Sequence, residues 1–213
     1  MHRSVVLVVV LALVAAGSAL AARGDPQKRI TAADQARAKA MLIRKADLGL
    51  AFRAMPSNPD QGDSYCQALD ESDLTLTGDA ESPDFQGGTT FVSAEAEIYE
   101  SVADANTPWR RGTSPAGETC IRSLFKREFA KSGVRFLSFR RLQFPHVIQK
   151  TIAYRLVSSA QGVRIFFVVI VRQQGRAQVS IAIGSGLILA PKDEEVRLAR
   201  LTARRIVKAM RGA

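Results

Sequence analysis

The feature that most constrains the fold is a series of four segments rich in alternating apolar side chains, which fills residues 134–189. Short extended segments joined by tight turns pair with their neighbours, so the series predicts a four-strand antiparallel meander. Residues 165–171 are all β-branched or aromatic, and we expect that strand to lie centrally and to be covered on both faces. The segments are Val134–Phe144, Val147–Val157, Val163–Arg172 and Ala177–Leu189, with turn residues Pro145, Gly162 and Gly175.

A helix is predicted to close the chain after this meander. Pro191 is followed by three acids at 193–195, which the positive end of a helix dipole favours. Lys208 and Arg211 stand at the other end, where the dipole favours cations. The pattern therefore indicates a helix that starts near Pro191.

An earlier strand, Phe91–Tyr99, shows the cleanest alternation in the chain. Residues 92, 94, 96 and 98 are apolar and fall on one side, whereas Ser93, Glu95 and Glu97 fall on the other. This pattern is typical of an antiparallel sheet that has one face in water. Two shorter strands are indicated at Leu50–Phe52 and Leu74–Thr77.

Three further segments carry helix signals. Thr31, with Asp34 three residues later, begins a helix that Gly49 ends. Ser101 begins a short one that Pro108 ends or kinks, and Ser114-Pro115 begins the next. The fold class is therefore α+β, an antiparallel sheet of six to seven strands with helices packed against it, ending in the meander and closing helix.

The N-terminal residues predict export. A basic start at Arg3 precedes an apolar run, and Ala19-Leu20-Ala21 matches a signal peptidase site. We expect a signal peptide at 1–22, a linker at 23–30, a single domain at 31–213 and a secreted or extracytoplasmic location. The alternative is an uncleaved membrane anchor, because the stretch Val5–Ala22 is 18 residues long, just enough to span a bilayer. No cysteine follows the run, so lipid anchoring is not expected.

The chain has two cysteines, Cys66 and Cys120. An even pair in an oxidising compartment is usually bridged, so we predict a disulfide. Cys120 shares the apolar face of its predicted helix, from which it can reach Cys66. Closing the loop between them would stabilise the fold by roughly 4 kcal/mol. The alternative is two buried free thiols.

Charge is distributed unevenly along the chain, whose net charge is +10. Residues 60–104 hold twelve acids and no Lys or Arg, whereas residues 106–213 hold 21 basic residues and five acids. If both segments share one sheet, they are expected to neutralise each other in part.

No standard catalytic constellation is visible. His146 is the only histidine after the apolar start, and Gly184-Ser185-Gly186 lacks an adjacent base. The acids between Asp60 and Asp73 lack the spacing of a calcium loop. We therefore expect no enzyme, no cofactor and no metal, although a hydrolase with an unfamiliar site stays an alternative.

The closing helix carries a basic stripe that could meet phospholipid headgroups or acidic wall polymer. The alternative is a solvated face on a helix that packs against the sheet with its apolar side. Nucleic acid is not expected as a partner, because the basic segments contain no run of stacking aromatics. The stripe consists of Arg197, Arg200, Arg204, Lys208 and Arg211.

Several sequence segments resemble those of a known class of proteins. The run Lys45–Phe52, the strand ending Ile98-Tyr99, the cysteine-bearing helix and the late meander are similar to secreted actinobacterial domains of the receptor-kinase extracellular sensor type. The layout also resembles the Mog1/PsbP-like sandwich. The sensor family usually has two disulfides and this chain has cysteines for one, so no binding residues are carried over.

The resemblance implies a sensor-like role, and the missing catalytic groups agree with it. Our leading hypothesis is an exported binding or sensor-like domain that recognises a small ligand or an envelope component through its sheet face or helix edge. The alternative is an envelope-surface protein held on anionic lipid or wall polymer by the basic stripe.

Overall fold

The structure is a computed structural model that describes residues 24–55 and 65–211. The predicted signal peptide, and the acids Asp60 and Asp63, lie outside the described residues. Within the described ranges, no helix is both long enough and apolar enough to cross a bilayer.

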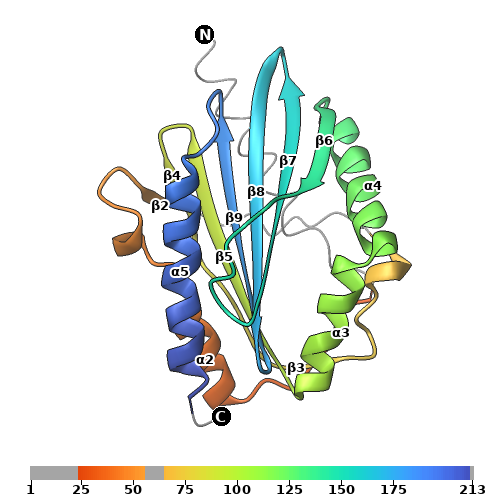
Figure 1. Cartoon of the computed structure of the whole chain (residues 1–213), viewed down its shortest axis with the longest axis vertical. Coiled ribbons are helices and arrows are strands. Elements are labelled where there is room, and N and C mark those ends of the chain that lie inside the picture. The colour runs from red at the N-terminus through yellow and green to blue at the C-terminus, as the bar shows by residue number, and fades with distance from the viewer. Residues whose placement is uncertain (1–23, 56–64, 212–213) are drawn as a thin grey trace.

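One mixed sheet of nine strands organises the described residues (Figure 1). Its main path runs β1-β3-β5-β9-β8-β7-β6, and β4 joins β2 to β5. The pairing is antiparallel except between β1 and β3. The strands are β1 (Gln27–Lys28), β2 (Arg53–Met55), β3 (Thr75–Glu81), β4 (Asp84–Gly87), β5 (Thr90–Tyr99), β6 (Arg135–Arg141), β7 (Lys150–Ala160), β8 (Val163–Gln174) and β9 (Ala177–Gly186).

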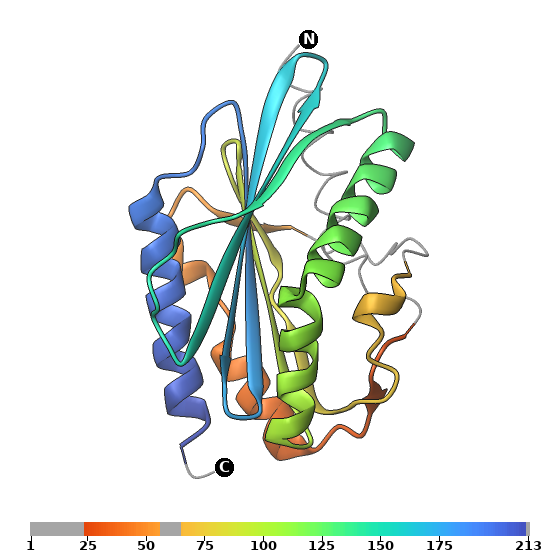
Figure 2. The same cartoon turned by 45° about the vertical axis from the view of Figure 1, so that its right-hand side comes forward.

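Helices cover both faces of this sheet. In Figure 2, α2 and α5 stand on one side of the sheet and α3 and α4 on the other. Short 3-10 turns, η1 and η2, lie in the connections. The bounds are α2 (Ala32–Met41), η1 (Lys45–Asp47), η2 (Gln67–Leu69), α3 (Val102–Thr113), α4 (Pro115–Lys131) and α5 (Lys192–Ala209).

The α+β fold, the meander and the closing helix are confirmed. Strands β6 to β9 pair in sequence order, and α5 begins directly after Pro191. The predicted helix starts at Thr31, Ser101 and Ser114 are also confirmed, because each side chain accepts a hydrogen bond from a main-chain N–H three residues later.

Several predicted details are wrong. The sheet has nine strands because two short segments add to it, β4 and also β1, which lies within the stretch predicted to be a linker. α2 ends at Met41, well before Gly49, and the strand predicted at 50–52 lies at 53–55. α3 continues past Pro108, which is buried inside it, so the helix does not end at this residue.

The third strand of the meander, β8, is less covered than its composition predicts. It lies inside the sheet, yet Phe166, Val169 and Val171 are only half-buried. Phe166 lies on the opposite face from the other two, so cover is incomplete on both sides of this strand.

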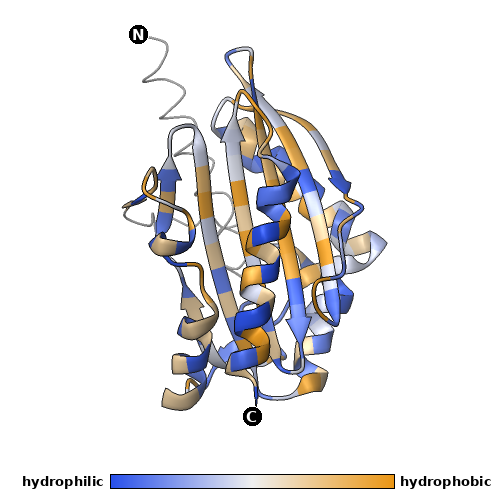
Figure 3. Ribbon diagram, turned by 60° about the vertical axis from the view of Figure 1, so that its left-hand side comes forward, coloured by the Kyte–Doolittle hydropathy of each residue, from blue (hydrophilic) through white to orange (hydrophobic). Residues whose placement is uncertain are grey.

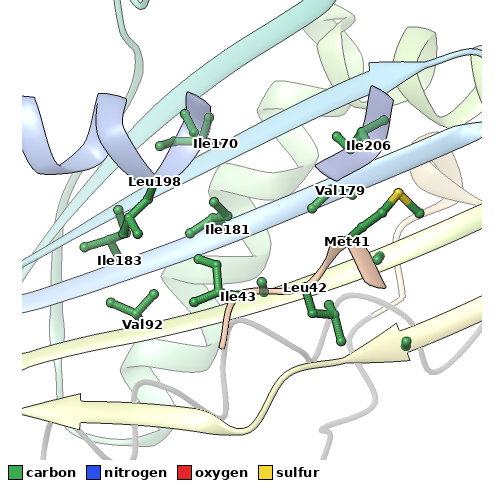
Figure 4. Packing of buried hydrophobic residues seen from close by; sticks show 14 of the residues in the cluster. Met41, Leu42, Ile43, Val92, Ile170, Val179, Ile181, Ile183, Leu198 and Ile206 are labelled. Atoms are coloured by element: carbon green, nitrogen blue, oxygen red, sulfur yellow. The ribbon is translucent and has the colours of Figure 1, made fainter. Parts of the chain in front are cut away.

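The main apolar core lies between the sheet and the pair α2 and α5. Figure 4 shows Ile181 and Val179 of β9 beneath Leu198 and Ile206 of α5, with Met41 of α2 close by. A second core lies on the other face, where Phe125 and Phe129 of α4 pack with Phe139, Tyr154 and their neighbours.

The predicted disulfide is confirmed. Cys66 and Cys120 are bonded, with their Cα atoms 6.3 Å apart. The bond ties the start of η2 to the first half of α4. It therefore links the α3 and α4 layer to the connection that leads into β3.

Candidate ligand-binding face

The central strands β5 and β9 present a row of polar side chains on the sheet side that carries α3 and α4. Glu95 is opposite Ser180 and Glu97 is opposite Gln178, and Ser93 continues the row. Glu95 is exposed and the other four side chains are half-buried, although these strands lie in the middle of the sheet. We call these five residues the polar sheet face.

Strand β3 extends this face with two more acids. Asp79 is opposite Glu97 and Glu81 is opposite Glu95, so carboxylates face one another across the strands. Like charges in directly opposite positions destabilise a sheet. Lys28 neutralises Asp79 at 2.7 Å, whereas Glu81 and Glu95 have no ion pair with any other described residue.

A buried tyrosine connects the face to the loop before β3. The Tyr99 hydroxyl lies 3.0 Å from a carboxyl oxygen of Glu71 and 3.0 Å from one of Glu97. A phenol has a single proton to donate. Both contacts can be hydrogen bonds only if one of the two carboxyl groups is protonated and donates to Tyr99.

The electrostatics of the face agree with such a shared proton. Burial, followed by the nearby charge of Glu71, raises the pKa of Glu97 to about 8. Burial also raises the pKa of Glu71 to about 7. The pKa of Glu95 is raised by desolvation, Glu97 and Glu81, although its exposed side chain leaves these charges more open to screening by solvent.

Gln178 adds an unused acceptor. Its side-chain nitrogen donates to Glu97 at 3.4 Å, while its Oε1 atom is buried and has no hydrogen-bond partner in the part of the chain that the structure describes. Buried polar atoms are normally paired. The face therefore offers carboxylate and amide oxygens, which suit a ligand that carries amines or other hydrogen-bond donors.

The basic stripe predicted on α5 is only partly free. Arg197 forms a bidentate ion pair with Glu194 and also donates to the Asp47 carbonyl. Arg200, Arg204, Lys208 and Arg211 are exposed. Hydrophilic and hydrophobic residues alternate along α5 in Figure 3, as expected of a helix with one buried side.

The other residues singled out in the sequence lie apart from the polar sheet face. His146 is exposed at a pocket of about 490 Å³ that is also lined by Arg141, Thr151 and Lys192. Ser185 is buried in β9 opposite Phe166. Within residues 24–55 and 65–211, no group of three His, Cys, Asp or Glu residues is placed to hold a metal.

The acids after Cys66 are held by local bonds. Asp73 pairs with Arg111 at 2.7 Å, and Asp70 accepts hydrogen bonds from Ser72 and Tyr65. The ion pair between Arg111 and Asp73 neutralises part of the acidic segment, as the uneven charge distribution predicted. They leave Glu81, Glu95 and Glu97 as the acids that crowd together.

The sequence pattern predicted the polar, solvent-facing side of β5 but not two residues that contact this side. Glu71 reaches it from a loop, and Gln178 reaches it from a strand about 80 positions away in the chain. The alternation of residues 177–183 placed Gln178 and Ser180 on one side, and this signal could have suggested a polar face spanning two strands.

No protein-family model and no curated protein matches the sequence. Among solved structures, the chain is similar to the extracellular domain of PknH from Mycobacterium tuberculosis, with 10% identity, a TM-score of 0.44 and coverage of 83% of this chain and 96% of that one. It is also similar to an uncharacterised protein of Mycobacterium smegmatis, the Rv0999 ortholog, with 15% identity, a TM-score of 0.44 and coverage of 84% and 98%. The resemblance to the Mog1/PsbP-like sandwich stays a prediction.

Proposed function

We propose that this chain is an exported, non-enzymatic binding domain of the sensor type, and that its polar sheet face receives a small cationic ligand. One observation carries the proposal. The two central strands of a nine-stranded sheet leave one side incompletely covered, and that side holds crowded carboxyl groups.

The location is supported by the disulfide. A bond between Cys66 and Cys120 fits an oxidising compartment, where such bonds form and persist. The apolar start of the sequence supports export independently.

The cationic character of the ligand follows from charge. Crowding of Glu81, Glu95 and Glu97 costs free energy in the unliganded protein, as their cross-strand arrangement with one another and with Asp79 implies. A bound ammonium or guanidinium group would relieve this repulsion and could also donate to the free oxygen of Gln178.

The test is a calorimetric and thermal-shift comparison of polyamines, basic amino acids and their neutral analogues. We expect the cations to raise the melting temperature and the neutral analogues to leave it unchanged. Replacing Glu95 by Gln should weaken binding by about tenfold, because one charge-assisted contact is lost.

The matched control is Glu100→Gln, which removes one exposed carboxylate directly after the same strand. Binding should be unchanged in this variant. Equal weakening by both substitutions, or no stabilisation by any cation, would refute the proposal.

A further inference from the structure

The sheet side that carries α5 holds a separate group of arginines near the free edge. Arg140 of β6 lies directly opposite Arg155 of β7. Further along, Arg135 is opposite Ser159, which is itself opposite Arg164 of β8. Arg155 also pairs with Val168 of the α2 and α5 core, which places this group on that side. We call Arg135, Arg140, Arg155 and Arg164 the arginine face.

The arginine face is open. Arg135, Arg140 and Arg164 are exposed, and Arg155 is half-buried. In Figure 1, which views this side, no helix lies in front of the upper parts of β7 and β8.

These four guanidinium groups have no ion pair among the residues described. Arg155 also keeps a buried Nε atom without a hydrogen-bond partner in the same ranges. Burial raises the pKa of Glu195 more than the charge of Arg155 lowers it. Glu195 is 1% exposed, and its Oε1 atom has no hydrogen-bond partner among the described residues. Two arginines directly opposite one another destabilise the sheet, and no described carboxylate forms an ion pair with either of them to offset this cost.

Apolar side chains accompany the arginines. Val157 and Phe166 are half-buried and lie between the two rows of arginine. Beyond the end of β9, Leu187 and Ile188 are 60% and 77% exposed. Large apolar residues at such exposure beside a basic surface are typical of proteins that sit on membranes.

Leu187 is held in an uncommon conformation. Its φ is +72°, in the left-handed region that side chains other than glycine rarely adopt, and its N–H donates to the Arg164 carbonyl at 3.1 Å. The loop thus presents an apolar residue to solvent, at a cost in backbone energy, right beside the arginine face.

We propose that the arginine face, together with Leu187 and Ile188, docks on a bilayer that carries anionic phospholipid headgroups. Guanidinium groups match phosphate oxygens in a bidentate geometry, and the two apolar side chains enter the region below the headgroups. This contact is separate from the polar sheet face, which lies on the other side of the sheet.

The α5 stripe is the weaker candidate for this role. Arg197 is already neutralised by Glu194. Leu198 and Ile206, which adjoin the stripe, are fully buried against the sheet, and the most exposed large apolar residue beside it, Val207, is 40% exposed. The stripe therefore supplies charge with little apolar surface for insertion.

The experiment measures cosedimentation of the exported chain with phosphatidylcholine vesicles that contain or lack phosphatidylglycerol. We expect binding only to the anionic vesicles. The variant Arg140→Glu with Arg164→Glu should lose at least about tenfold in affinity, because electrostatic attraction to anionic lipid depends on each basic residue near the surface.

The matched control is Arg200→Glu with Arg204→Glu, which makes the same charge change on α5. It should stay within about twofold of the parent protein. An equal loss in both variants, or a loss in the α5 variant alone, would overturn the proposal. If the glutamates prevent folding, Arg140→Gln with Arg164→Gln makes the same comparison against Arg200→Gln with Arg204→Gln.

A third variant separates a bilayer from a soluble anionic polymer. Ile188→Ser leaves the charge unchanged and should weaken vesicle binding several-fold while leaving binding to inorganic polyphosphate as it was. If Ile188→Ser binds anionic vesicles as well as the parent does, the contact is electrostatic alone and the bilayer proposal fails. Failure of either result leaves the cation-binding proposal unaffected, because the two faces share no residue.

Discussion

The two sides of strands β5 and β9 are formed by alternate residues of the same two strands and differ in almost every physical respect. On the α2 and α5 side, Ala96, Ile98, Val179 and Ile181 are fully buried. On the other side, Glu95 is exposed, and Glu97 and Gln178 are half-buried with raised pKa values or unpaired atoms.

This contrast separates stability from binding. The apolar side removes hydrocarbon from water and holds two helices, which stabilises the fold. The polar side crowds like charges and leaves an acceptor unsatisfied, which costs free energy in the isolated protein. Side chains that destabilise the protein in which they sit are typical of sites where a partner binds.

The largest effect is expected when a new carboxylate is introduced on one side of β5 or on the other. Ala96→Glu should lower the free energy of unfolding by more than about 4 kcal/mol, because an unpaired charge would enter the apolar core. Ser93→Glu, on the polar sheet face, should cost roughly 1 kcal/mol or less. Chemical denaturation of both variants measures the difference, and similar losses would show that the two sides are not distinct.

Removal of the disulfide should destabilise the α3 and α4 side of the sheet more than the α2 and α5 side. Replacing Cys66 and Cys120 by Ser should lower stability by about 2–4 kcal/mol, because the unfolded chain regains entropy. Hydrogen exchange should accelerate first in η2 and the start of α4, which the bond joins, and should stay slow in β9. Uniform acceleration would contradict this order.

Truncation of a single core residue gives a smaller effect of the same sign. Ile181→Ala should cost about 3 kcal/mol through lost burial and the cavity left behind. Its neighbour Ser180 lies on the polar sheet face, and Ser180→Ala should change the free energy of unfolding by less than about 0.5 kcal/mol. Urea titration of the pair provides the comparison.

The smallest expected effect is a pH dependence that arises on the polar side. The folded-state pKa of Glu97, about 8, and that of Glu71, about 7, lie above the usual value of 4.5. Between pH 4.5 and 8 the folded protein therefore holds protons that the unfolded chain has released, so stability must fall as pH rises.

We expect a loss of roughly 1–2 kcal/mol across this range, visible as a melting temperature lower by several degrees. Glu97→Gln should reduce the slope, whereas Glu100→Gln should leave it unchanged. A melting temperature that rises between pH 5 and pH 8 would contradict the raised pKa values of Glu97 and Glu71.

Much of the fold could be predicted from local pattern. The alternation in β5 identified both the buried and the wet side, and cap residues such as Thr31 and Ser114 located the helix starts. Pro108 misled the prediction that a helix ends there, because α3 continues to Thr113 although proline removes a main-chain hydrogen bond. The two-residue strand β1 carries too little pattern to be recognised.

The candidate faces were harder to predict, because each depends on register between strands. Arg140 and Arg155 look like scattered basic residues in the sequence, and only the pairing of β6 with β7 sets them opposite one another. Likewise, nothing in the sequence brings Glu71 to Tyr99, since the two groups meet through a loop whose path depends on the packed sheet.

The sequence by itself determined the α+β class, the order of the meander and closing helix, and which side of β5 meets water, because these follow from the period of apolar side chains and from local caps. Only the tertiary structure decided which charges become neighbours: Glu97 with Tyr99, Arg111 with Asp73, and the arginines on one open sheet side. Electrostatic energy depends on separation in space, and separation along the chain does not specify it.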